Sequence, residues 1–400
     1  MNVALLPWDR MWGDLAPVGR DARSGGYRRS AWTSEDATLR EWFAGEAAAR
    51  GLDLVTDRAG NQWAWWGDPD ADGPGLVLGS HLDSVPDGGA FDGPLGVVSA
   101  FAALDAVRDR GFTPSRPIAV AHFCDEEGAR FGIACAGSRI LTGALDAVRA
   151  RGLTDADGIT MAEAMTRAGH DPAHLGTDAE TLRRVGTFVE LHVEQGRGLA
   201  DLDRAVAVGS AIRPHGRWRV DLPGEANHAG TTLLADRDDP MLAFASLVLA
   251  AREAAEKHDA VATCGKVRVE PNGVNAIPSL VTGWVDARGD DEARVRAVIA
   301  DLTSLVEDRR GTLTEESWTG ITPFPTDLAG RLSALLDDAP VLATGAGHDA
   351  GILSAAGVPT AMLFVRNPTG VSHSPAEFAE RDDCLAGVAA LATVAEELAR

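Results

Sequence analysis

Six side chains of metal-binding type lie at or just beyond the ends of apolar, strand-like runs. Four such runs stand out: Gly75–Gly79, Ile118–Phe123, Thr187–Val193 and Thr360–Val365. The side chains are His81, Asp92, Glu126, Glu127, His192 and His373. In an open α/β sheet, the loops at the carboxyl ends of the strands line one crevice, so we expect these groups to meet there. Imidazole and carboxylate together suit zinc, manganese, cobalt or nickel, and the sequence therefore predicts a metal centre.

One segment carries both an imidazole and a carboxylate suited to two cations. It reads GSHLDSVPDGGAFDGPLG and contains His81 and, eleven residues later, Asp92. A bridging carboxylate holds two cations close together because it neutralises part of their mutual repulsion. Asp83 lies two residues after His81, and we expect it to accept a hydrogen bond from the imidazole nitrogen that faces away from the metal.

A second segment, HFCDEEGARFG, places two acidic residues side by side at a strand end. Neighbouring side chains there point in different directions, so one of Glu126 and Glu127 can bind metal while the other acts as a general base. Alone, an acidic pair is usually a solvated turn, and a single histidine after a strand is usually a polar loop residue. The joint occurrence of such residues at four strand ends favours the metal site.

The alternation of strands and helices predicts an α/β fold that is interrupted in the middle. Helices are expected at Gly96–Arg108 and Asp382–Leu398 in the outer part. From about Ile212 to Pro323, a separate pattern predicts strands at Arg217–Leu222, Gly265–Glu270 and Leu280–Arg288, and helices at Pro240–Glu256 and Glu292–Glu307. We therefore predict a split domain of residues 1–211 and 324–400, interrupted by an α+β domain of residues 212–323.

The composition excludes some classes of partner. The chain has 400 residues and a formal net charge of -22, which argues against nucleic acid because phosphate binding needs a basic face. No apolar run reaches the roughly 18 residues that a membrane span needs. The first residues do not resemble a signal peptide, and the four cysteines form no CxxC pair. The expectation is a cytoplasmic enzyme with free thiols.

With these residues identified, the chain resembles the M20 family of metallohydrolases over nearly its whole length, from about Gly19. The match is to the branch of allantoate amidohydrolases, N-carbamoyl-L-amino-acid hydrolases and β-ureidopropionases. The motifs are GSHLDSVPDGGAFDGPLGV, DEEGARFG, ELHVEQG, GEANHAGTT, PNGVNAIPS, GAGHDAG and VSHSPAE. The resemblance implies a catalytic domain with a mixed, mostly parallel sheet flanked by helices, and a smaller α+β lid that carries the contact of a homodimer.

The resemblance also implies roles for the metal-binding residues. Two divalent ions are expected, with Asp92 as the bridge and His81 and His192 on different ions. Glu127 and His373 would fill the remaining positions, and Glu126 would be the general base. Peptidases of the wider family have an acidic residue in place of His192, so this histidine favours the carbamoyl-hydrolase branch.

Further residues are implied to bind substrate. His228 would stabilise the developing oxyanion, and Asn275 and Arg288 would clamp the substrate carboxylate, a role that suits the planar guanidinium. Gln195 is expected to contact substrate, and His348 to contact substrate or support a residue that does. Three alternatives stay open: Asn275 as a turn former, His228 as a structural loop residue, and Arg288 in an ion pair with one of the nearby acids Asp286, Asp290 and Asp291.

One departure from the family pattern concerns the substrate. Many carbamoyl-amino-acid hydrolases have a GQR-like stretch ahead of the first lid strand, where this chain reads Pro214-His215-Gly216. His215 is therefore a specificity element or a plain loop residue. The sequence predicts hydrolysis of the ureido or carbamoyl group of a small carboxylate, with allantoate as the leading substrate. N-carbamoyl-L-amino acids and N-formyl or N-formimino amino acids are alternatives, followed by a non-catalytic binding protein.

Overall fold

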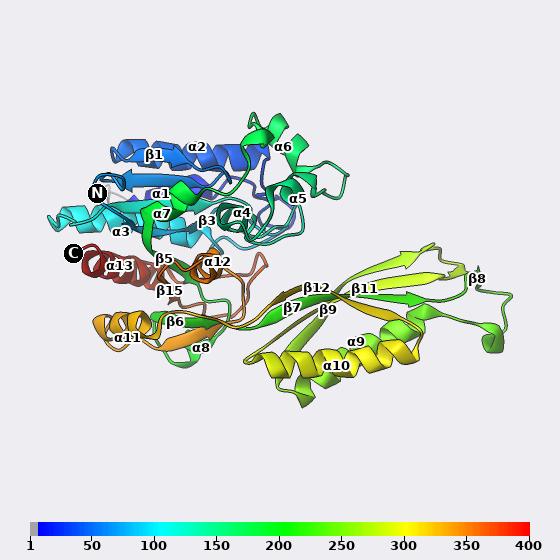
Figure 1. The fold of residues 1–400 in the computed structure, drawn as a ribbon. Helices are drawn as coiled ribbons and strands as arrows, with labels where there is room; N and C mark the ends of the chain where they lie inside the picture. Colours follow the sequence, from blue (N-terminus) through cyan, green and yellow to red (C-terminus); the bar gives the residue numbers. More distant parts are fainter. Residues whose placement is uncertain (1–6) are drawn as a thin grey trace. The chain divides into compact units, whose positions relative to one another are not determined.

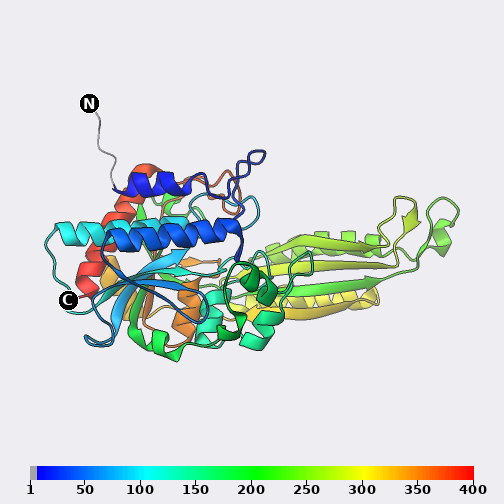
Figure 2. The same ribbon diagram turned by 90° about the horizontal axis from the view of Figure 1, so that it is seen from above.

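The computed structural model describes residues 7–400, which form two compact units. The first contains the described residues up to Ala211 together with Pro323–Arg400, and the second contains Ile212–Thr322. Each unit has its own cluster of buried apolar side chains. The colours in Figures 1 and 2 follow the chain as it leaves the first unit in green and re-enters it in orange.

A nine-stranded mixed sheet forms the centre of the first unit. Its main path runs in the order β1-β2-β4-β3-β5-β15-β6-β13, and β14 pairs with β6. The strands are β1 (Asp53–Thr56), β2 (Gln62–Trp66), β3 (Gly75–His81), β4 (Ile118–Phe123), β5 (Val185–Val193), β6 (Val206–Ile212), β13 (Thr322–Pro323), β14 (Val341–Thr344) and β15 (Thr360–Val365). Strands β4, β3, β5 and β15 run parallel, whereas β1, β2 and β6 pair antiparallel. The predicted α/β fold with a mixed sheet is confirmed.

Helices cover both faces of this sheet. They are α1 (Pro7–Leu15), α2 (Ser34–Ala49), α3 (Pro94–Asp109), α4 (Ala136–Thr142), α5 (Ala147–Gly152), α6 (Met161–Arg167), α7 (Ala179–Arg184), α8 (Gly198–Asp201), α11 (Thr326–Leu335), α12 (Asp349–Ala355) and α13 (Arg381–Leu398), with a 3-10 turn η1 (Pro172–His174). Figure 2 shows α2 beside α3, and the ring of Phe43 lies 5.1 Å from that of Phe101.

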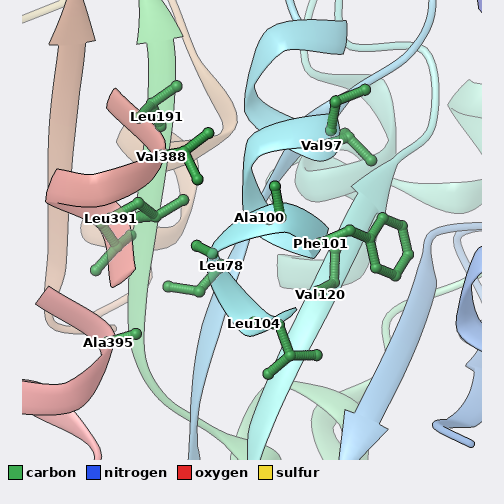
Figure 3. Packing of buried hydrophobic residues seen from close by; sticks show 14 of the residues in the cluster. Leu78, Val97, Ala100, Phe101, Leu104, Val120, Leu191, Val388, Leu391 and Ala395 are labelled. Carbon is green, nitrogen blue, oxygen red and sulfur yellow. The ribbon is translucent and has the colours of Figure 1, made fainter. Parts of the chain in front are cut away.

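The pleat of the central strands separates the core from the site. In Figure 3, Leu78, Val120 and Leu191 point toward the apolar faces of α3 and α13. Because successive side chains of a strand alternate between the faces, the neighbouring positions point the other way. There Phe188 packs on Phe123, with ring centroids 5.4 Å apart. The face of β3 and β5 that meets α3 and α13 is therefore mainly apolar, and the other face carries polar groups toward the strand ends.

Helix α3 lies so close to the sheet that one of its residues has to be glycine. A Cβ atom on Gly96 would lie 2.3 Å from the main-chain oxygen of Leu191 and 2.6 Å from Cβ of Ser80. Helix α3 follows the loop that carries Asp92. The close approach of the helix therefore also sets where that loop ends.

The second unit is a four-stranded antiparallel sheet with two helices on one face. The sheet order is β12-β7-β11-β9, and β8 pairs separately with β10. Its elements are β7 (His215–Pro223), β8 (Asn227–His228), η2 (Leu234–Asp236), α9 (Pro240–Lys257), β9 (Ala260–Glu270), β10 (Ala276–Ile277), β11 (Leu280–Gly289), α10 (Glu292–Asp308) and β12 (Thr312–Thr319). Alternate residues of β7, such as Trp218 and Val220, are buried and belong to one apolar cluster with residues of α9 and α10. Figure 1 shows both helices along one face of this sheet.

Among residues 7–400, no helix combines the length and apolar character that crossing a bilayer requires.

Two helical glycines predict opposite effects of the same substitution. Gly96→Ala should lower the free energy of unfolding by about 1–3 kcal/mol, because the new methyl group meets main-chain atoms that cannot move aside. Gly45→Ala in α2, where nothing lies within 4 Å, should raise it by about 0.5–1 kcal/mol through helix propensity. Urea denaturation midpoints measure both, and equal shifts would contradict the close packing of α3.

Candidate functional site

Two neighbouring parallel strands bring the first two histidines together. In the ladder between β3 and β5, Gly79 pairs with Glu190, so the next side chains on the same face are His81 and His192. Their ring centroids lie 5.9 Å apart, and both residues are buried. The parallel register therefore places both imidazoles at the same end and on the polar face of the sheet.

His81, His192 and Asp92 form one group of potential metal ligands. The Nε2 atoms of His81 and His192 lie 3.6 and 3.1 Å from Oδ1 of Asp92. The implied assignment of His81 and His192 to different metals is therefore wrong for this geometry. The register of β3 and β5 explains the correction, since it places both imidazoles on one face, at the same end of the sheet.

A second group contains Asp92, Glu127 and His373. Nε2 of His373 lies 3.4 Å from Oδ2 of Asp92 and 3.5 Å from Oε2 of Glu127. The Asp92 carboxylate thus presents one oxygen to each group, as expected for a bridge between two ions. His373 has a positive φ of 54°, and its side chain is 51% exposed, so this group is more open than the first.

The main chain orients the buried histidines. Nδ1 of His81 lies 3.2 Å from the main-chain oxygen of Asp83, and Nδ1 of His192 lies 2.9 Å from that of Val193. A carbonyl oxygen can only accept, so in the neutral rings the proton is on Nδ1 and the lone pair is on Nε2. Among the described residues, neither Nε2 atom has a hydrogen-bond partner, and neither does Oε1 of Glu127. These buried atoms fit a site for divalent cations.

Three side chains hold the Asp92 segment in place. Oε1 of Glu377 accepts hydrogen bonds from the main-chain nitrogens of Phe91 and Asp92, at 2.8 and 2.9 Å. Oδ2 of Asp92 accepts from Nε2 of Gln195 at 2.9 Å and from Oγ of Ser372 at 3.2 Å. The amide group of Gln195, expected to contact substrate, therefore orients the shared carboxylate in this structure.

Asp83 positions the acidic pair rather than the imidazole through its carboxylate. Its two carboxylate oxygens accept hydrogen bonds from the main-chain nitrogens of Glu126 and Glu127, at 3.1 and 3.0 Å. Its Oδ1 lies 3.4 Å from Nδ1 of His81, farther than its own main-chain oxygen. The carboxylate was expected to orient His81, but the main-chain oxygen of Asp83 is the nearer acceptor.

Burial and mutual charge shift the acid–base properties of these groups. Burial raises the pKa of Glu126 well above its usual value, and burial with the Asp92 charge raises that of Glu127 to about 7. The contact with Asp92 raises the pKa of His373 to about 9. Burial opposes ionisation of Asp92, but His192, His373 and His81 together hold its pKa well below the usual range. The ionised Asp92 is thus the fixed negative charge of the site.

His348 lies beside the first group. It precedes α12, and its ring packs edge-on against that of His192 at 4.5 Å. Glu190, which the sequence analysis missed, forms a further potential ligand group with these two histidines. Glu190 accepts hydrogen bonds from Oγ of Ser80 at 2.7 Å and from the main-chain nitrogen of Ala350 at 3.1 Å, and so connects β3, β5 and α12.

The other four predicted residues lie in the second unit, in two pairs. His215 and Arg288 face each other in the β7–β11 ladder, and Arg288 forms an ion pair with Asp286 at 2.7 Å. This ion pair is the alternative that the sequence left open. His228 pairs with Ala276 in the β8–β10 ladder, and the main-chain oxygen of Asn275 accepts from Ala229 at 2.9 Å. Nδ1 of the exposed His228 accepts from the main-chain nitrogen of Gly230 at 3.0 Å, which leaves the proton of the neutral ring on Nε2.

Several residues that support the site were missed in the sequence. Ser372 and Glu377 flank His373 within the motif VSHSPAE, and Glu190 precedes His192 by two positions in ELHVEQG. The alternation along a strand would have placed Glu190 on the face of His192. The contacts of Ser372 and Glu377 with the Asp92 loop join segments about 280 residues apart, as the pairs Ser372–Asp92 and Glu377–Phe91 show. A pattern of neighbouring residues in the sequence cannot predict contacts between segments so far apart.

The sharing of Asp92 predicts unequal effects on metal binding. Asp92→Asn should lower the binding of divalent cations more than either His192→Ala or His373→Ala, because only Asp92 belongs to both of these groups. Equilibrium dialysis with elemental analysis measures bound metal per chain. His174→Ala, which removes a histidine with an 84% exposed side chain, is the control. Equal losses in all three site variants would argue against a shared carboxylate.

Comparison with known proteins identifies the family of this chain. Residues 77–397 match the model of the peptidase family M20/M25/M40. An N-carbamoyl-L-amino acid amidohydrolase of Geobacillus stearothermophilus is 35% identical over 99% of this chain and 100% of its own length. Allantoate amidohydrolase of Escherichia coli K12 is 33% identical over 98% of this chain and 96% of its own.

A solved structure extends the likeness to the whole fold. An amidase of the hydantoinase/carbamoylase family from Burkholderia vietnamiensis superposes with a TM-score of 0.88, at 29% identity, over 98% of this chain and 96% of that one. The chain therefore belongs to the peptidase family M20/M25/M40 and, within it, to the hydrolases of non-peptide C–N bonds.

Proposed function

We propose that this protein hydrolyses the C–N bond of a ureido or carbamoyl group in a small carboxylate, with allantoate as the leading substrate. The observation that carries the proposal is the pair of ligand groups that share Asp92, with Glu126 beside them. The use of His192, rather than an acid, at its position supports a ureido substrate over a peptide. The similarity to an allantoate amidohydrolase supports the substrate class.

Two divalent cations are part of this proposal. His81, Asp92 and His192 would hold one, and Asp92, Glu127 and His373 the other. When bound, such cations polarise a carbonyl oxygen and lower the pKa of water. The ligand set of imidazole and carboxylate is compatible with zinc, manganese, cobalt or nickel.

Glu126 is proposed as the general base. It is buried, and its Oε2 lies 3.7 Å from Nε2 of His81, so its carboxylate faces the first ligand group. From there it can take a proton from the attacking water and deliver it to the leaving nitrogen. Bound cations would add positive charge beside Glu126. This charge would lower the pKa of Glu126 and favour the ionised form that a general base requires.

For the second unit, we propose the role of a lid that contributes substrate-binding groups and the contact of a homodimer. His228 would donate from Nε2 to the developing oxyanion, which agrees with the acceptor role of its Nδ1. Arg288 and Asn275 would bind the substrate carboxylate. The guanidinium group of Arg288 already donates to the carboxylate of Asp286, through Nε at 2.7 Å and Nη2 at 3.2 Å. A substrate carboxylate would compete with Asp286 for it.

A second candidate is hydrolysis of N-carbamoyl-L-amino acids. The similarity to an amidohydrolase of that specificity favours it, and the chemistry at the scissile bond would be the same. N-formyl and N-formimino amino acids also present a carbonyl-type carbon and a carboxylate. His215, which faces Arg288 across the β7–β11 ladder, is the proposed specificity residue among these substrates.

The test of the function is a substrate panel with metal-reconstituted protein. The panel contains allantoate, several N-carbamoyl-L-amino acids, β-ureidopropionate and N-formyl-L-glutamate, and ammonia and formate are measured in parallel. Metal-dependent turnover that strongly favours allantoate is expected, and chelator-treated protein is the control. Turnover of another member alone would keep the chemistry and change the substrate. No turnover with both metals bound would favour a binding protein.

The role of Glu126 predicts a separation of metal binding from turnover. Glu126→Gln should keep the wild-type metal content and lower kcat by about 10²–10⁴-fold, the usual contribution of a general base. Steady-state kinetics and elemental analysis on the same sample measure both quantities. Glu41→Gln, at an exposed position of α2, should leave both unchanged. Wild-type turnover in Glu126→Gln would remove this residue from the base role.

A further inference from the structure

A buried thiol contacts the side chain of Glu126. Sγ of Cys135 lies 3.2 Å from Oε1 of Glu126, in hydrogen-bond geometry with the thiol as donor. Both residues are buried, at 2% and 5% exposure. The sequence analysis treated Cys135 only as one of four free thiols, and the proposed mechanism assigns it no role.

The backbone holds these two residues opposite each other. The main-chain nitrogens of Cys135, Ala136 and Gly137 donate to the main-chain oxygens of Glu126, Asp125 and Cys124, at 2.5, 2.9 and 2.9 Å. These three bonds join the start of α4 to the end of β4. They also satisfy nitrogens that otherwise lack partners at a helix start. These main-chain hydrogen bonds therefore fix the side chains of Cys135 and Glu126 next to each other.

The backbone angles beside these hydrogen bonds are unusual for residues with side chains. Cys135 has a φ of 55° and Asp125 a φ of 53°, both in the left-handed region. The loop between them closes tightly, since a Cβ on Gly128 would lie 2.2 Å from main-chain atoms of Ile133. Left-handed conformations at non-glycine residues are strained, and such strain is often found at functional sites.

The chemistry of the pair determines which group donates. Burial raises the pKa of the Cys135 thiol well above its usual value, so the sulfur keeps its proton. In the ionised form that a general base requires, the Glu126 carboxylate can only accept, so the thiol proton points to Oε1. Oε2 is the oxygen that lies 3.7 Å from Nε2 of His81, beside the first ligand group. The two oxygens of Glu126 therefore have different surroundings.

We propose that Cys135 is a positioning residue for Glu126: its S–H group holds Oε1 and so directs Oε2 toward the ligand group, where the reacting water would lie. The proposal rests on the proposed function of Glu126 as the base. Cys135 itself takes part in no bond-making step. Without the thiol, Oε1 would be a buried acceptor with no partner, and the carboxylate could rotate away from the water.

The test compares Cys135→Ala with Cys135→Ser. The alanine variant should lower kcat about tenfold, the effect of one lost hydrogen bond, with KM and metal content unchanged. The serine variant keeps a donor of similar size and should restore kcat to within about threefold of wild type. Cys384→Ala removes another buried thiol, in α13, and should leave kcat unchanged even if it lowers stability.

Two outcomes would overturn the proposal: wild-type kcat in Cys135→Ala, or a serine variant no more active than the alanine variant. Thermal denaturation of each variant shows whether the chain is folded at the assay temperature. In a Glu126→Gln background, Cys135→Ala should cause no further loss of kcat, because the two residues act as a unit. A further tenfold loss of kcat in this double variant would show that Cys135 acts independently of Glu126.

A spectroscopic measurement keeps this test independent of turnover. The S–H stretching band of Cys135 is identified as the band that Cys135→Ser abolishes. It should move to higher frequency in Glu126→Ala, where the acceptor is gone. A band that does not move would show that the thiol does not donate to Glu126. If wild type hydrolyses no substrate in the panel while the band does move, the proposed function fails and the contact stands.

Discussion

The site depends on the position of a single carboxylate, that of Asp92. Each of its oxygens faces a different group of potential ligands, so the separation of the two groups is set by the width of one carboxylate. Asp92 lies in a loop, and loops need support to hold a side chain within the tolerance of metal chemistry. Gln195 and Ser372 hold its Oδ2, and Glu377 holds its main chain. Gly93 completes the fit, since a Cβ there would overlap the ring of His81.

The charge around Asp92 explains why such support is needed. Several carboxylates are buried within the same region, namely Asp83, Asp92, Asp125, Glu126, Glu190 and Asp349. Burying like charges together is costly unless they are protonated, hydrogen-bonded or paired with cations. Burial raises the pKa of Asp125, Glu126 and Asp349 well above normal. Divalent cations at the two ligand groups would offset the remaining negative charge, in keeping with the proposed metal dependence.

The two units have separate physical origins. In the first, the parallel strands are buried on both faces and are mainly apolar, and site residues such as His81, Glu190 and His192 lie in their carboxyl-terminal halves. In the second, antiparallel strands alternate buried and exposed residues, because α9 and α10 cover one face of the sheet. This unit has a buried core of its own, which includes Trp218 and Leu302.

The hydrophobic pattern and the sequence motifs were enough to predict much of the fold and many residues of the site. Strands β4 and β15, the α/β fold and the residues of both ligand groups could be predicted, because strand period, helix period and residue type are local properties. The grouping of those residues could not. That His81 and His192 face the same oxygen of Asp92 follows from the register of β3 against β5, and that Ser372, Glu377 and Cys135 support the site follows from contacts between distant segments. Such contacts exist only when the chain is folded, since register and loop closure are decided by packing between elements and not by any element alone.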